Sequence, residues 1–148
     1  MKKAMKKAVK NVIVALCCAL VAVSTIMSCV GSGDPTVDYQ IVGDVTNTYG
    51  YPLSGIKVTL KDEDETMYTD SRGHYESRTY QSTDLSKEVM ILFEDVDGED
   101  NGGDYHSGGV KSKLNKLPLT IIKEGHKRYL GSYIVTVDVQ MVGADEKK

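Results

Sequence analysis

The stretch Gly50-Tyr51-Pro52-Leu53-Ser54-Gly55-Ile56-Lys57-Val58-Thr59-Leu60 joins a turn to a strand and decides the fold class. Its first half is rich in glycine and proline, which is typical of a turn because glycine tolerates unusual φ values and proline fixes φ. Its second half alternates apolar and polar residues with period two, which predicts a strand with Ile56, Val58 and Leu60 on one face.

The same pattern continues in both directions along the chain. Strand-forming residues recur in short runs at Tyr39–Val45, Ile56–Leu60, Met67–Thr69, His74–Tyr80, Val89–Phe93, Leu117–Ile122 and Ser132–Val142. Turn signals separate these runs, and no stretch after residue 30 keeps a helical period over three turns. We therefore predict an all-β fold, a seven-stranded antiparallel β-sandwich. The continuous apolar run Val89–Phe93 predicts a central strand covered on both faces.

Residues 1–28 have the composition of a lipoprotein signal peptide that ends directly before Cys29. Five lysines within residues 2–10 precede the uncharged run Val12–Met27. A bilayer-spanning helix needs about 20 apolar residues, so this shorter run suits a cleaved signal helix better. Ser28 is the small residue expected before the cleaved bond. The alternatives are an uncleaved helix and an ordinary signal followed by an incidental cysteine.

The lipoprotein interpretation predicts that Cys29 is the lipidation site. A thioether to diacylglycerol forms before cleavage, and the freed amine then takes an acyl chain such as palmitate. Several chains hold a protein firmly, because each buried CH₂ adds about 0.8 kcal/mol. Cleavage removes Cys17 and Cys18, so the mature chain is expected to have no disulfide and no cysteine nucleophile.

The mature chain is acidic. All 21 acidic residues follow the signal, but only 13 of the 18 basic residues do, which gives residues 29–148 a formal charge of −8. This charge argues against nucleic acid as a partner and against binding of anionic lipid through a basic patch. It favours cations or basic surfaces as partners, or serves solubility alone.

Three blocks in one order resemble a known domain family: Gly43–Thr46, Gly50–Val58 and Thr69–Tyr75. They are similar to carboxypeptidase regulatory-like domains, which are small transthyretin-like (prealbumin-like) β-sandwiches. In such a pattern Asp70 would cap the second turn through its side chain, and Gly73 would take a positive φ there.

The resemblance completes the expected organisation of the chain. We expect a signal peptide over 1–28, a lipid-anchored linker over 29–36, a carboxypeptidase regulatory-like β-sandwich over 37–144 and a charged tail over 145–148. The linker is expected to be flexible because it is rich in glycine and serine.

A second resemblance covers nearly the whole chain. The signal, Cys29, this domain and Phe93–Gly103 together resemble lipoproteins encoded beside radical SAM proteins. This resemblance implies an envelope lipoprotein that is the partner or the substrate of a radical SAM enzyme, and it supplies no catalytic residue. No aspartate follows Cys29 directly, so the outer membrane of a bacterial envelope is the expected location.

An acidic, glycine-rich loop follows the apolar run that ends at Phe93. Its oxygen-bearing side chains are Asp95, Asp97, Glu99, Asp100, Asn101 and Asp104. Calcium takes six to eight oxygen ligands, so this loop is a candidate calcium site. It is not an EF-hand, because Asp100 and His106 stand where that motif requires glycine and glutamate. A solvated acidic loop is the alternative.

No catalytic arrangement is recognisable in the sequence. The three histidines, His74, His106 and His126, lack the spacing of a zinc site. There is also no nucleophile elbow and no phosphate-binding loop. We therefore expect a non-enzymatic lipoprotein with an accessory or structural role.

A cell-surface binding module for glycan or peptide is the alternative function. Tyrosines would supply the stacking platform of such a module. The candidates are Tyr49, Tyr51, Tyr68, Tyr75, Tyr80, Tyr105, Tyr129 and Tyr133.

Overall fold

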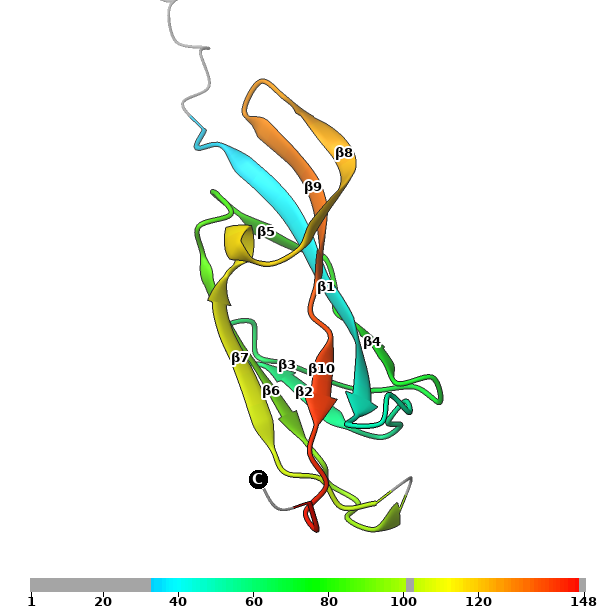
Figure 1. Cartoon of the computed structure of the whole chain (residues 1–148). Coiled ribbons are helices and arrows are strands. Elements are labelled where there is room, and N and C mark those ends of the chain that lie inside the picture. Colours follow the sequence, from blue (N-terminus) through cyan, green and yellow to red (C-terminus); the bar gives the residue numbers. More distant parts are fainter. Residues whose placement is uncertain (1–32, 101–102, 147–148) are drawn as a thin grey trace, which may run out of the picture. The chain divides into compact units, whose positions relative to one another are not determined.

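A computed structural model describes residues 33–100 and 103–146 of the chain, and these residues are all-β (Figure 1). Residues 34–148 form one compact unit. The expected signal helix over 1–28, the lipidation site Cys29 and the loop residue Asn101 lie outside the described residues. Within those residues, no helix is long and apolar enough to cross a membrane.

The first sheet is built around one long strand. Its members are β1 (Thr36–Asn47), β4 (His74–Glu76), β5 (Tyr80–Ser82), β8 (Leu119–His126), β9 (Tyr129–Thr136) and β10 (Val139–Met141). Strands β4 and β5 pair antiparallel with one edge of β1, and β9 and β10 pair parallel with the other. Strand β8 pairs antiparallel with β9.

The second sheet has four antiparallel strands in the order β3-β2-β6-β7. They are β2 (Lys57–Leu60), β3 (Glu65–Tyr68), β6 (Glu88–Glu94) and β7 (Gly108–Lys113). A short 3₁₀ turn, η2 (Leu114–Lys116), then leads the chain from β7 towards β8 in the first sheet.

The core lies between the two sheets. Alternate residues of β1 point inward, and Tyr39, Ile41 and Val45 are fully buried there. They belong to one cluster with residues of β2 and β6. The predicted inner face of the second strand is confirmed, because Ile56, Val58 and Leu60 are all buried.

The prediction of seven antiparallel strands was wrong in number and in pairing. The expected strand over His74–Tyr80 is split into β4 and β5, and the one over Ser132–Val142 is split into β9 and β10. Strand β7 was missed, because Gly108–Lys113 contains a single apolar residue, Val110. The pairs that β1 forms with β9 and with β10 are parallel, whereas the prediction had antiparallel pairs throughout.

The prediction for Val89–Phe93 was correct in position and wrong in burial. The run forms most of β6, which lies between β2 and β7. Val89, Ile91 and Phe93 are buried, whereas Met90 is 39% exposed. One face of β6 therefore lacks a covering layer, since each sheet of a two-layer fold has only one inner face.

Candidate functional site

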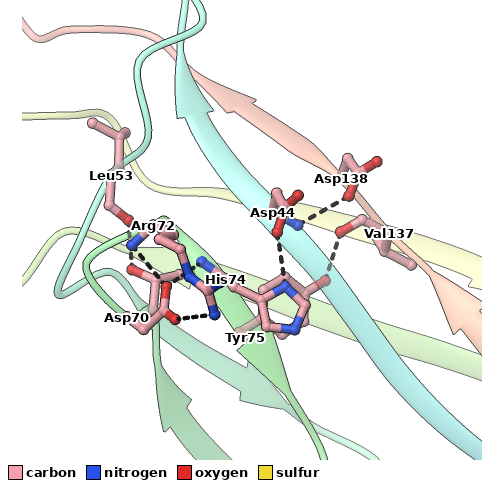
Figure 2. Close-up of polar contacts among 9 residues, drawn as sticks. Asp44, Leu53, Asp70, Arg72, His74, Tyr75, Val137 and Asp138 are labelled. Atoms are coloured by element: carbon pink, nitrogen blue, oxygen red, sulfur yellow. Dashed lines mark hydrogen bonds and ion pairs between the residues drawn. The ribbon is translucent and has the colours of Figure 1, made fainter.

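The turn before β4 is held together by the side chain of Asp70 (Figure 2). Asp70 Oδ1 accepts the backbone N–H groups of Arg72 at 2.8 Å and of His74 at 2.9 Å. Gly73 has a φ of 77°. The predicted cap and the predicted positive φ are both confirmed. Hydrogen bonds from the N–H groups of His74 and Arg72 stabilise the charged form and hold the pKa of Asp70 below its ordinary value.

This turn places His74 beside a carboxylate of the neighbouring strand. Asp44 on β1 is the register partner of His74 on β4, and Asp44 Oδ1 lies 2.8 Å from His74 Nδ1. Asp138 belongs to the segment between β9 and β10, and its Oδ1 accepts the backbone N–H of Asp44 at 2.9 Å. Figure 2 shows His74 and Asp44 on the β4–β1 strand pair, with Asp138 on the neighbouring segment. Asp44 and Asp138 also line a shallow groove of about 410 Å³.

The opposite face of the same strand pair is rigidly packed. Tyr75 is buried, and its hydroxyl donates to the carbonyl of Val137 at 2.7 Å. Its ring meets Phe93 edge-on, with centroids 5.7 Å apart. Burial raises the pKa of the Tyr75 hydroxyl above its ordinary value. The exposed Asp44–His74 pair therefore lies on two strands whose inner face is packed in the core.

The Asp44–His74 pair lies at the surface, where it is open to polar binding. The side chains of His74 and Asp44 are 38% and 59% exposed, so water competes for both. Within residues 33–100 and 103–146, no three His, Cys, Asp or Glu side chains are grouped as a metal site. Sequence reasoning missed the partner of His74, because the pairing depends on the register of β1 against β4.

Asp95, the first residue of the acidic loop, binds backbone groups from both ends of that loop. Asp95 Oδ1 accepts the N–H groups of Asp97 and Gly98 at 3.2 Å each, and its Oδ2 accepts the N–H of Tyr105 at 2.9 Å. These bonds join the two ends of the loop. Desolvation, and a hydrogen bond shared with the Asp97 carboxyl, raise the pKa of Asp95.

The other predicted calcium ligands are dispersed. Glu99 and Asp104 line a groove of about 330 Å³ together with Asn47 and Tyr49, while Asp100 is exposed elsewhere on the loop. Asp95 and Asp97 therefore lie next to each other, whereas Glu99 and Asp104 share only the lining of one groove. The calcium site stays a prediction.

The eight candidate tyrosines do not act as one group. Tyr75 is buried in the core, and Tyr129 donates its hydroxyl to Asp38 at 2.9 Å. Tyr49 and Tyr51, on the turn after β1, are 76% and 70% exposed. Exposed aromatic area is therefore concentrated at that turn, beside the groove that Tyr49 lines.

A polar cluster that sequence reasoning missed joins the two sheets. The Tyr39 hydroxyl donates to Glu63 Oε1 at 2.5 Å, and Lys87 pairs with the same carboxylate. The Tyr80 hydroxyl donates to Glu65 in the same way. Burial first, and the hydrogen bond to Glu65 next, raise the pKa of Tyr80 to about 12. Glu63 and Glu65 therefore each accept a hydrogen bond that links the two sheets.

Comparison with known proteins identifies no family. No protein-family model matches the chain, and no curated protein matches it. The similar solved structures include 3-chlorocatechol 1,2-dioxygenase from Rhodococcus opacus 1CP, with 10% identity and a TM-score of 0.46. They also include catechol 1,2-dioxygenase from Pseudomonas arvilla C-1, with 12% identity and a TM-score of 0.49.

The two alignments cover 78% of this chain in each case. They cover 62% of the Rhodococcus enzyme and 55% of the Pseudomonas enzyme, so the chain spans about three fifths of the length of these neighbours. At this identity and TM-score, the similarity supports no conclusion about activity.

Proposed function

We propose that this chain is a non-enzymatic lipoprotein of the bacterial envelope, anchored in the outer membrane through acylated Cys29. The observation that carries the proposal is the order of lysines, uncharged apolar residues and Ser28-Cys29 at the start of the chain. The first strand begins at Thr36, so a short linker separates the proposed anchor from the folded domain.

The finer fold class that we propose for residues 37–144 is the transthyretin-like sandwich of carboxypeptidase regulatory-like domains. Two packed sheets and the capped turn at Asp70–Gly73 support it. The role that we propose for this domain is accessory or structural, as the partner or substrate of a radical SAM enzyme.

Metabolic labelling with palmitate tests the anchor. The wild-type chain should take up label, and Cys29→Ser should take up none, because only the Cys29 thiol can form the thioether that precedes acylation. Cys18→Ser is the matched control, since that cysteine leaves with the signal. Equal labelling of the wild type and Cys29→Ser would refute the proposal.

A binding module is the second candidate, and one observation favours it. Tyr49 is 76% exposed and lines the groove with Glu99 and Asp104, so an aromatic face and carboxylates adjoin there. Such a site suits a sugar hydroxyl array or a basic peptide. Glycan-array and peptide-array binding should fall with Tyr49→Ala and persist with Tyr68→Ala, a control that is 58% exposed on β3. Equal binding by both variants would exclude this site.

A further inference from the structure

The hairpin formed by β8 and β9 exposes an unusual share of the apolar surface. Ile121, Ile122 and Leu130 are 58%, 60% and 40% exposed. Among the described residues, they are three of the four exposed valine, isoleucine and leucine side chains. A register shift between Ile121 and Lys123 places Ile122 in a bulge, outside the regular pairing with β9.

The tip of this hairpin is basic in an acidic protein. Lys123, Lys127 and Arg128 stand there against Glu124 on the hairpin and Asp38 on β1, whose carboxylate accepts the Tyr129 hydroxyl at 2.9 Å. The amine of Lys123 lies 5.4 Å from the ring centre of Tyr129. The backbone of Lys127 has a φ of 57°, a region that favours glycine or asparagine. Lys127 therefore occupies a turn position whose backbone conformation is unfavourable for lysine.

The hairpin tip adjoins the start of the folded domain. Thr36 pairs with Tyr129, and the Thr36 N–H donates to the carbonyl of Arg128 at 2.9 Å. Figure 1 shows the hairpin beside the first residues of β1. Cys29 precedes Thr36 by seven residues, which can span at most about 25 Å. The proposed lipid anchor is thus held within reach of the tip.

The acidic loop lies at the other end of β1. Glu99 and Asp104 share a groove with Asn47, the last residue of that strand. A strand of 12 residues is about 36 Å long at roughly 3.3 Å per residue. Charges are screened over about 10 Å at 0.1 M salt, so the loop leaves the field at the basic tip largely unchanged.

We propose that the β8–β9 hairpin lies on the surface of the bilayer that holds the anchor. Ile121, Ile122 and Leu130 enter the headgroup region, and the lysines face anionic headgroups. Apolar side chains beside lysine and arginine are the composition of interfacial surfaces. This inference rests on the proposed lipidation of Cys29. The net charge of residues 29–148 predicts no binding to anionic lipid, but that expectation treats the charge as evenly spread. The inference revises it, because the cations gather at the hairpin tip.

A fluorophore on a single introduced cysteine tests the inference. The full chain, processed and lipidated in a bacterial host, is labelled at Ile122→Cys and reconstituted into vesicles of phosphatidylethanolamine and phosphatidylglycerol. The matched control is Tyr49→Cys, which is exposed on the turn after β1. We expect the iodide quenching constant at position 122 to be at least threefold lower than at position 49. Equal quenching at the two positions would overturn the inference.

The same assay tests whether the lysines contribute to membrane contact and whether a second copy of the chain covers the hairpin instead. Combining Lys123→Gln with Lys127→Gly should restore at least half of the quenching at position 122, while glycine relieves the positive φ and keeps the turn. Unchanged protection in this variant would overturn the role of the cations. Protection that rises with the protein-to-lipid ratio would identify a second copy as the occupant and overturn the inference.

The intact mass of the same sample separates the two proposals. A preparation with acyl chains on Cys29 and an accessible label at position 122 contradicts the hairpin inference alone. A preparation without acyl chains contradicts the proposed function.

Discussion

Thr69 is a buried polar residue that fastens the turn in front of β2. Its hydroxyl donates to the carbonyl of Leu53 at 2.6 Å and accepts the N–H of Ile56 at 3.0 Å. Thr69→Val keeps the shape and leaves both backbone groups without this partner. We expect the free energy of unfolding to fall by about 1–3 kcal/mol in urea denaturation. Thr66→Val, on the exposed face of β3, is the matched control and should change it by less than about 0.5 kcal/mol.

Asp70 gives a prediction about pH. Backbone N–H groups of His74 and Arg72 hold its folded-state pKa below its unfolded value. The charged carboxylate therefore contributes stability above the unfolded pKa, and this contribution is lost as the pH falls through the folded pKa. Asp70→Asn keeps the acceptor oxygen and removes the charge. The difference in urea midpoint between wild type and Asp70→Asn should shrink between about pH 5 and pH 2. A constant difference over that range would contradict this account.

Local chemistry at the residue scale could be predicted from the sequence, but contacts between distant residues could not. The Asp70 cap and the positive φ of Gly73 depend on neighbours within four residues, so turn signals suffice to predict them. The Asp44–His74 pair depends on the register of two strands 30 residues apart. A shift of one residue would send His74 to the opposite face of the sheet, and no local signal fixes that choice.

At the scale of elements, β1 and the junction of β9 with β10 approach closely at Gly43. A Cβ atom on Gly43 would lie 1.9 Å from the carbonyl oxygen of Val137. Gly43→Ala must push the backbones apart, so we expect at least the loss of about 1–3 kcal/mol that is typical of overpacking. Gly108→Ala is the control, because its Cβ would meet nothing within 4 Å. Equal urea midpoints for the two variants would show that the approach is not rigid.

Elements with strong apolar alternation were predictable, and those without it were not. The run Ile56–Leu60 shows its buried face directly in its period of two. Strand β7 is held by its hydrogen bonds to β6 and has little apolar character of its own. The break between β9 and β10 falls at Val137 and Asp138, inside an otherwise regular strand pattern. Tertiary pairing decides such elements.

The acidic loop is the element on which the calcium prediction depends. If calcium binds there, it relieves repulsion among carboxylates such as Glu99 and Asp104, and it stabilises the fold by mass action. The calcium interpretation predicts a higher melting temperature in millimolar calcium than in chelator, measured by circular dichroism. Magnesium at the same ionic strength controls for screening. Identical midpoints in all three conditions would leave the solvated loop as the interpretation.

At the scale of the whole molecule, the domain is polarised along β1. The start of that strand adjoins the basic hairpin tip and follows the proposed anchor by seven residues. Its end adjoins the acidic loop and the exposed tyrosines. In the proposed lipoprotein, the acidic end would face away from an anionic membrane and be presented to a partner. Two sheets and one core could be predicted from the sequence, but this polarity follows from strand order.

The intact mass of the protein purified from its native host, with peptide mapping, tests the central claim most directly. The account predicts the mass of residues 29–148 plus acyl chains, with the lipid on the peptide that begins at Cys29. A further mass shift on another peptide would show that the chain is modified, as expected for a substrate of the proposed radical SAM partner. A chain that still carries residues 1–28, or that has an unmodified Cys29, would contradict the claim.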